Sequence, residues 1–349
     1  MDIKPILELN NNNSDTDSEE EIFYDENKIL SSGSYDKKYD KFYFKYMNDK
    51  VNNLTKEANN YPESIDILSP IIGETISIGN YGDINEIIND EKKILKQTKA
   101  IKRFIEIIKN KFHPATFYNY MNMYEDIKNE ERNVLNYVKL KKIFPNNFIE
   151  LHDIFKTRNS IYYQNNYIYE KIDGNTLKYA IENKIMNDKE VNLFFSQLIY
   201  IITYSNINKL FHNDIKSDNI MYKRVNNIIK YDNLLIDKYK CKLKIEMSDY
   251  FTPVLIDYDI SKQTEKYNQY PVELINIIII LTTIKNNSLL EILTNFFDNK
   301  LLNELDICIF GDNMNTVKTQ KYYDNIQVMK DEDKIKLINM FKEINKLIN

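Results

Sequence analysis

Apolar and polar residues alternate along several short stretches of the chain. From Ile76 to Ile88 the alternation runs on both sides of Gly79 and Gly82, which predicts a β-hairpin with its turn at these two glycines. Similar patterns predict further strands over residues 99–105, 148–155, 160–168, 220–222 and 253–261. Most of the predicted strands therefore lie in the first half of the chain.

Other stretches have the spacing of helices. Tyr124 to Leu140 is predicted as a helix because Ile127, Val134 and Val138 fall on or near one face. Further helices are predicted over residues 41–61 (weakly), from about 176, and over 188–206, 274–281, 285 onward and 335–348. The apolar run 274–281 is too short for a bilayer and reads as a buried helix, so no membrane span is expected.

One polar motif stands between apolar residues at the centre of the pattern. It has the form H-x-D-x-K-x-x-N, with His212, Asp214, Lys216 and Asn219. In phosphoryl transfer such a loop lets the Asp accept a hydroxyl proton, the Lys steady the transferred group and the Asn hold a metal ion. The same octet could instead be a polar loop in which Asp214 caps a turn and Asn219 is left-handed. The octet alone leaves both interpretations open.

A second acid follows an apolar strand. Asp257 comes directly after Pro253–Ile256, so its carboxylate would lie at the mouth of the core, where a magnesium ion could bind it. Alone, an acid at a strand end is most often only a turn residue. Together with Asn219, it makes a candidate metal pair.

The glycine hairpin offers a phosphate-binding turn. Ile78, Gly79 and Gly82 are the candidates, because glycines let backbone amides approach phosphates closely. On the predicted strand that follows, Lys102 lies within an apolar alternation, and Glu131 on the next helix could pair with it. The simpler alternatives are an ordinary hairpin, a solvated lysine and an exposed acid.

Composition narrows the class of protein. The chain has 349 residues, of which 43% are hydrophobic, enough for a sizeable core. Its net charge of −5 gives no global basic field, so no nucleic acid partner is expected. Only two cysteines, Cys241 and Cys308, and the lack of a secretory signal favour a reducing, cytoplasmic location.

The order of these signals resembles that of the eukaryotic-like protein kinase superfamily, from about Ile76 to Ser261. The resemblance implies that ATP and Mg²⁺ are bound and that serine or threonine hydroxyls of proteins are phosphorylated, because Lys216 follows the base by two residues. It makes Asp214 the base and Lys216 its phosphate-contacting neighbour. It further implies the following roles: Lys102 and its partner Glu131 over the phosphates, Glu170 to Ile172 as the hinge that meets adenine, and Asn219 and Asp257 as magnesium ligands. The residue usage makes the chain similar to kinases of large DNA viruses of the poxvirus type, which would place it in the host cytoplasm or the virion.

The resemblance also implies an α+β fold of two lobes, a small lobe with an antiparallel sheet and a mainly helical lobe, with the nucleotide between them. We therefore expect a disordered acidic tail over residues 1–40, an N-terminal lobe with a leader segment over 41–172, and a helical C-terminal lobe over 173–349. The long separation of Asn219 from Asp257 predicts an insertion over 223–252.

Several positions depart from the kinase pattern. The usual Arg before the base is Asn213, the usual glycine of the D-F-G motif is Asp259, and the segment from Asp257 to Pro271 is short. Tyr270–Glu273 is a poor match to the A-P-E motif. These departures put the peptide-binding platform in doubt, and they predict activity without phosphorylation of the loop from Ile260 to Tyr270.

Two alternatives remain open. A small-molecule phosphotransferase of the choline-kinase or aminoglycoside-kinase kind shares the H-x-D-x-x-x-x-N and I-D-x-x elements. A catalytically inactive pseudokinase scaffold is the other, although Lys102, Asp214, Asn219 and Asp257 are all present.

Overall fold

A computed structural model describes residues 25–79, 82–247, 249–259, 261–263, 271–297 and 329–349. The acidic residues 15–21 and most of the loop from Ile260 to Tyr270 lie outside this part of the chain. Residues 25–40 differ from the expected tail, because they contain helix α1 (Glu26–Ser32) and the 3₁₀ helix η1 (Lys37–Tyr39).

A five-stranded sheet forms the small lobe. Its strands follow the order β1-β2-β3-β5-β4, and every neighbouring pair is antiparallel. The bounds are β1 (Ile72–Ile78), β2 (Gly82–Ile87), β3 (Asp90–Thr98), β4 (Leu151–Asn159) and β5 (Tyr162–Glu170). The hairpin predicted around Gly79 and Gly82 is the β1–β2 pair.

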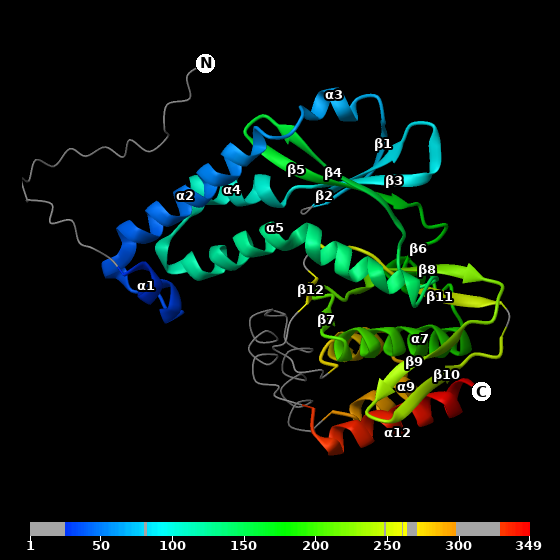
Figure 1. Cartoon of the computed structure of the whole chain (residues 1–349). Coiled ribbons are helices and arrows are strands. Elements are labelled where there is room, and N and C mark those ends of the chain that lie inside the picture. Colours follow the sequence, from blue (N-terminus) through cyan, green and yellow to red (C-terminus); the bar gives the residue numbers. More distant parts are fainter. Residues whose placement is uncertain (1–24, 80–81, 248, 260, 264–270, 298–328) are drawn as a thin grey trace, which may run out of the picture.

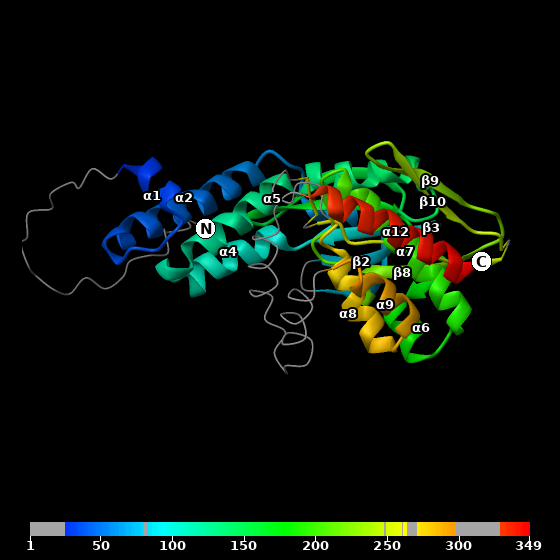
Figure 2. The same ribbon diagram turned by 90° about the horizontal axis from the view of Figure 1, so that it is seen from below.

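Helices extend from one side of this sheet as an arm (Figures 1 and 2). They are α2 (Asp40–Ala58), α4 (Ala100–Lys111) and the first half of α5 (Phe117–Val138), with η2 (Pro114–Thr116) between α4 and α5. The short α3 (Ser64–Leu68) leads from α2 to the sheet, and η3 (Lys139–Lys142) follows the other end of α5, at the main core. The arm has its own hydrophobic cluster, in which Tyr43, Met47, Phe104 and Phe117 are buried.

The strand predicted over residues 99–105 is wrong, because this stretch belongs to α4. Ile101, Phe104, Ile105 and Ile108 are all buried, and their spacing of three, four and seven residues places them on one face of a helix. The run Ile-Lys-Arg-Phe-Ile-Glu-Ile-Ile fits a strand over five residues and a helix over eight. A short apolar run alone does not separate the two structures.

Helix α7 (Asp188–Ile207) lies at the centre of the large lobe. Asn187 and Glu190 form a capping box at its start, and nearly every side chain from Leu193 to Ile202 is buried. Around it lie α6 (Leu177–Glu182), α8 (Leu274–Ile284), α9 (Asn287–Thr294) and α12 (Asp331–Ile348). The predicted helical character of this lobe is thus matched.

Two small sheets lie on either side of the polar motif, because β7 (Leu210–Phe211) ends just before it and β8 (Ile220–Val225) begins just after it. In the first, β11 (Tyr250–Leu255), β8 and β6 (Asn175–Thr176) lie side by side. In the second, β7 pairs with β12 (Lys262–Gln263). The 3₁₀ helix η4 (Ser217–Asn219) leads from the motif into β8.

The insertion between β8 and β11 forms a hairpin of β9 (Lys230–Ile236) and β10 (Tyr239–Lys244). The Tyr200 hydroxyl of α7 donates to Cys241 O (3.1 Å) and accepts from Leu234 N (2.8 Å). From the other side, Asn345 of α12 accepts from Lys244 N (3.0 Å) and donates to Lys242 O (2.6 Å). The hairpin is therefore an integral part of the large lobe (Figure 1).

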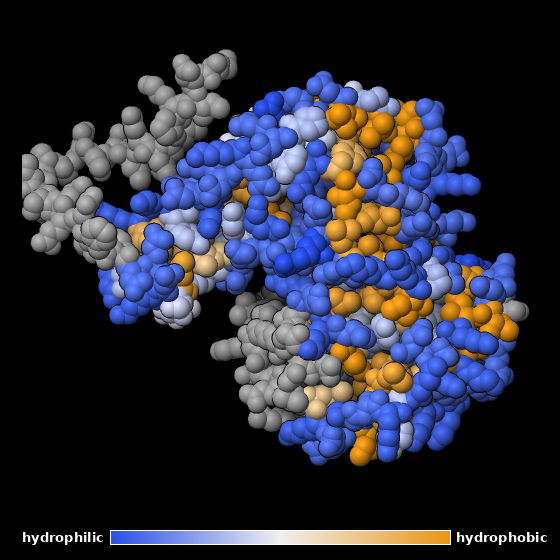
Figure 3. Space-filling view, in the orientation of Figure 1, coloured by the Kyte–Doolittle hydropathy of each residue, from blue (hydrophilic) through white to orange (hydrophobic). Residues whose placement is uncertain are grey.

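Hydrophilic residues cover much of the arm, while hydrophobic residues gather over the small lobe beside the sheet (Figure 3). The exposed apolar side chains of the small lobe include Ile65 on α3 and Ile76 and Ile78 on β1. In the described part of the chain, no helix combines the length and apolar character needed to cross a bilayer.

Candidate active site

The polar motif forms a loop between β7 and β8. Asp214 Oδ2 accepts hydrogen bonds from Lys216 Nζ and from Asn219 Nδ2, both at 2.6 Å. Asn219 Nδ2 also donates to the Asp214 carbonyl (3.0 Å). The three predicted residues are thus held together on one loop, with Asp214 at its centre.

The buried side chains of His212 and Glu273 fix the shape of this loop. His212 is fully buried, and its Nε2 lies 2.8 Å from the carbonyl oxygen of Ile256. Asn213 has φ of 62°, and its backbone N–H donates to Glu273 Oε1 (2.6 Å). The left-handed turn at Asn213 is therefore held by a carboxylate, and asparagine tolerates that conformation well.

Glu273 is a functional candidate that sequence reasoning missed. It immediately precedes α8, is 3% exposed, and its Oε2 accepts from Asn206 Nδ2 of α7 (2.7 Å). Burial raises the pKa of Glu273, while the nearby His212 and these hydrogen bonds oppose the shift. The sequence feature that could have pointed to Glu273 is its place as an acid immediately before a strongly apolar helix.

Asp257 reaches the same loop from the end of β11. The N–H of Ile256 donates to the carbonyl of Asn219 (3.1 Å), which brings the two predicted metal ligands to neighbouring backbone positions. Asp257 has φ of 67°, a left-handed conformation that turns the chain sharply after the strand. Its neighbour Tyr258 is buried and stacks on Tyr137 of α5, with ring centroids 4.8 Å apart.

Lys96 joins the small lobe to this site. It lies on β3, is 8% exposed, and its Nζ contacts Asp257 Oδ1 (2.5 Å) and Asp259 Oδ2 (2.8 Å). Burial would lower the pKa of Lys96, but the charges of Asp259 and Asp257 raise it above its ordinary value. Burial likewise opposes ionisation of Asp257, yet Lys96 keeps the pKa of that carboxyl below its usual range.

The structure does not bring Lys102 to this site, and Lys96 lies there instead. Lys102 lies on α4, its side chain is 46% exposed, and its ion-pair partner is Glu106 at 3.9 Å. Lys96 was missed because its strand is mostly polar, with the sequence Asp-Glu-Lys-Lys-Ile-Leu-Lys-Gln-Thr. A turn signal was present at Asn89-Asp90, where Asn89 has φ of 66°.

The expected partner Glu131 is corrected as well. Glu131 is half exposed and pairs with Lys156 (3.2 Å), whereas its neighbour Glu130 is 2% exposed and faces the site. Glu130 Oε1 accepts from Asn165 Nδ2 (3.0 Å) and from the Tyr167 hydroxyl (2.8 Å). Burial raises the pKa of Glu130, and the charge of Asp259 adds to this shift. The predicted pair of a lysine with an acid of this helix is therefore not formed by Glu131, and its neighbour Glu130, turned by about 100° on the helix, bonds to β5 instead.

The glycine hairpin has a tight turn. Gly79 N donates to Gly82 O (2.9 Å), and a Cβ on Gly82 would lie 2.8 Å from the carbonyl oxygen of Gln97 on β3. Only glycine therefore fits at position 82. Ile78 is 78% exposed, and Lys99 Nζ pairs with Asp83 (2.5 Å) at the base of the turn. A contact of Ile78, Gly79 or Gly82 with a nucleotide stays a prediction.

The predicted hinge follows β5. Glu170 Oε1 accepts from Lys141 Nζ (2.6 Å) and from the backbone N–H of Glu150 (2.9 Å), and Ile172 is buried against the main core. The Glu170 side chain is thus used within the protein, so its proposed part in adenine binding would fall to the backbone of this segment.

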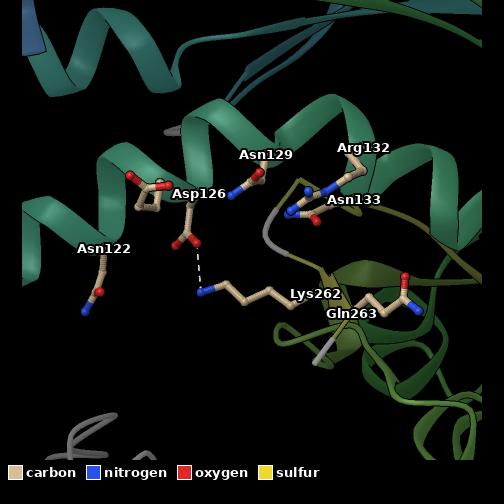
Figure 4. A pocket seen from close by; sticks show the side chains of 8 residues that line it. Asn122, Asp126, Asn129, Arg132, Asn133, Lys262 and Gln263 are labelled. Carbon is tan, nitrogen blue, oxygen red and sulfur yellow. Dashed lines mark ion pairs between the residues drawn. The ribbon is translucent and has the colours of Figure 1, made fainter. Parts of the chain in front are cut away.

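A polar groove separates α5 from the segment after Asp259 (Figure 4). It has a volume of about 240 Å³ and is lined by Asn122, Asp126, Asn129, Lys262 and Gln263, among others. Lys262 Nζ spans it to Asp126 (2.7 Å), and Asn136 Nδ2 of α5 donates to Gln263 Oε1 (3.1 Å). Helix α5 is therefore anchored to the large lobe as well as to the sheet.

Comparisons with known proteins bear on this geometry. No protein-family model matches the chain. Over 179 residues, 49% of this chain, the sequence is 25% identical to Protein kinase kin1 of Schizosaccharomyces pombe. The fold is a bilobal, kinase-like fold. The matched region covers 19% of that relative's length. The weak identity over half the chain indicates a kinase-like relationship, and the viral origin stays a prediction.

Proposed function

We propose that this protein is a kinase-like phosphotransferase that transfers the γ-phosphoryl group of ATP to serine or threonine hydroxyls of proteins. One observation carries the proposal. Lys96 of the sheet lobe contacts Asp257, and the backbone of Ile256 joins this acid to the loop of Asp214 and Asn219. A lysine, two possible metal ligands and a possible base, far apart in sequence, thus lie at one site, as phosphoryl transfer requires.

The proposed roles follow from the side chains. Asp214 has a carboxylate that can accept or orient the proton of an acceptor hydroxyl, and its two hydrogen bonds hold it in place. Lys216 would contact the transferred phosphoryl group, because its flexible ammonium group lies beside Asp214. Lys96 would contact the phosphates of the bound nucleotide, since it is a buried cation between the lobes.

Magnesium fits the donors at this site. Asp257 offers a carboxylate, and Asn219 offers its Oδ1 because its Nδ2 is used by Asp214. No cluster of three or more His, Cys, Asp and Glu able to hold a metal lies within the described ranges, so phosphate and water oxygens would complete the shell. When bound, the ion would neutralise charge on the phosphates.

A small-molecule phosphotransferase is a second candidate, and one observation favours it. Helix α8 begins at Leu274, and Glu273 immediately before it is tied to the catalytic loop through Asn213. Little chain is left between Asp257 and α8 to build a surface for a peptide. Protein and small-molecule acceptors therefore have to be tested together.

The test is incubation of the purified protein with labelled ATP, Mg²⁺ and either generic protein substrates or a panel of choline and amino sugars. We expect label in protein, recovered as phosphoserine or phosphothreonine, and less label by about 100-fold or more with the Asp214→Asn variant. Label in the small molecules alone would favour the second candidate. Nucleotide binding with no transfer to either panel would contradict both and support the scaffold alternative.

A further inference from the structure

The site contains one more acid than its proposed roles use. Lys96 contacts two carboxylates, Asp257 and Asp259, and these differ in their surroundings. The side chain of Asp257 is 31% exposed, whereas that of Asp259 is 9% exposed. A ligand entering from solvent can therefore reach Asp257 more easily, and Asp259 is placed to remain with Lys96.

The helix acid that would usually hold such a lysine is committed elsewhere. Lys96 and Tyr167 lie opposite each other on β3 and β5, so their side chains share a face of the sheet. The Tyr167 hydroxyl and Asn165 Nδ2 both donate to Glu130 Oε1. Glu130 thus ties α5 to β5, and Lys96 forms its ion pairs with the two aspartates.

We propose that Asp259 is the positioning residue of Lys96, holding the ammonium group at the phosphate site when Asp257 is engaged by the metal. This inference rests on the proposed function, since it concerns the same nucleotide site. Asp259 is well placed for the role. The Tyr258 ring beside it is stacked between lobes, and Ser261 Oγ donates to the Tyr258 carbonyl (2.7 Å), which fixes the backbone on both sides.

The pairing of Lys96 with Asp259 determines which movement of the protein would release the lysine. Where a lysine is held by an acid on a mobile helix, displacing the helix releases the lysine. Here the acid follows β11 on the large lobe, and its segment packs on α5 through the stacking of Tyr258 on Tyr137 and through Lys262 and Gln263. Movement of the Tyr258–Asp259 segment would therefore release Lys96, whereas a shift of α5 would act on the lysine only through this segment.

The experiment measures ATP affinity by calorimetry for wild type, Asp259→Asn, Glu130→Gln, Lys96→Met and the double variant Lys96→Met/Asp259→Asn. Asp259→Asn is expected to weaken ATP binding about tenfold, the scale of a charge-assisted hydrogen bond. The double variant is expected to bind ATP as weakly as Lys96→Met alone, because the two residues act as a unit. Glu130→Gln is expected to change ATP affinity less than Asp259→Asn does.

Two controls separate positioning from stability. Asp249→Asn removes an exposed acid paired with Arg224 and should leave ATP affinity unchanged, and Glu131→Gln is the matched control for Glu130→Gln. Thermal unfolding of each variant shows whether it is folded, and Asp259→Glu, which restores the charge, should recover part of the affinity.

The outcomes distinguish this inference from the proposed function. Equal ATP affinity of Asp259→Asn and wild type, or additive effects in the double variant, would overturn the role of Asp259 while leaving the phosphotransferase intact. A large loss in Glu130→Gln with none in Asp259→Asn would assign the role to the helix instead. A wild-type protein that binds no ATP would overturn the proposed function and this inference together.

Discussion

At the residue scale, Asp214 is the first side chain to test. Its Oδ2 holds both Lys216 and Asn219, so the Asp214→Asn change keeps the shape and removes the charge. We expect the rate of phosphoryl transfer to fall by about 100-fold or more, as for loss of a general base, with ATP affinity nearly unchanged. Steady-state kinetics with separate ATP titrations measure both quantities.

Asp218 provides a matched control, because it lies on the same loop, is half exposed and pairs with Lys178. Asp218→Asn should retain nearly full activity. Equal rates for Asp214→Asn and wild type would remove Asp214 from the mechanism.

Replacement of Lys96 and replacement of Lys102 are expected to lower the rate of phosphoryl transfer to very different extents. Lys96→Met removes a buried cation that contacts two aspartates, and we expect transfer to fall by roughly 100-fold or more. Lys102→Met removes an exposed side chain of α4, and the rate should change by no more than about twofold. The reverse order in a transfer assay would restore Lys102 to the site.

Among the predicted site residues, those of the polar loop have local contacts. Asp214, Lys216 and Asn219 lie within six residues, and their spacing alone brings them together. The contacts that bring Lys96, Asp259 and Glu273 to the site are with residues far away in the sequence. Lys96 is separated from Asp257 by 161 residues, and no local pattern distinguishes it from the neighbouring lysines of β3.

At the scale of elements, the strand β6 joins the segment after β5 to β8, which follows the loop of Asp214. Gly174 immediately precedes it, and a Cβ there would lie 1.9 Å from the carbonyl oxygen of Tyr222 on β8. Gly174→Ala must therefore push the two strands apart, and we expect the free energy of unfolding to fall by roughly 3 kcal/mol. Urea denaturation measures this loss.

Gly33 is the comparison for Gly174. It has φ of 65°, but nothing lies within 4 Å of the added Cβ, so Gly33→Ala should cost only about 1 kcal/mol. Equal losses in the two variants would show that β6 and β8 move apart at little cost, so that the contact with Tyr222 does not require glycine at position 174.

Elements with clear patterns were predicted well, among them α7 and the β1–β2 hairpin, whereas α4 and β3 were not. Helix α7 begins at Asp188 as expected, because its capping residues and apolar run agree. Helix α4 was predicted as a strand and β3 was not predicted, since the first is an apolar run of ambiguous period and the second is dominated by charged residues. In both, packing on neighbouring elements decides the structure.

At the scale of the whole molecule, the described chain has two hydrophobic clusters, one in the arm and one that spans the large lobe and the sheet. Phe117 is buried in the first and Phe341 in the second. Changing either to Ala should cost about 3–5 kcal/mol. We expect Phe117→Ala to speed amide hydrogen exchange in α2 and α4, and Phe341→Ala to speed it in α7 and α12.

Hydrogen exchange read by mass spectrometry separates these regions. If each variant speeds exchange equally throughout the chain, the two clusters unfold as one cooperative unit. Differences confined to the cluster that carries the change would show that the arm opens on its own.

The position of α12 has a consequence for synthesis on the ribosome. Its residues Leu337, Met340, Phe341 and Ile344 fill the core beside α7 and the β9–β10 hairpin, which are translated much earlier. Until α12 has emerged, the apolar surfaces that it covers stay open to water and to other nascent chains. The large lobe can therefore complete its core only after translation has reached this helix, and the interval before then is when the chain most needs a chaperone.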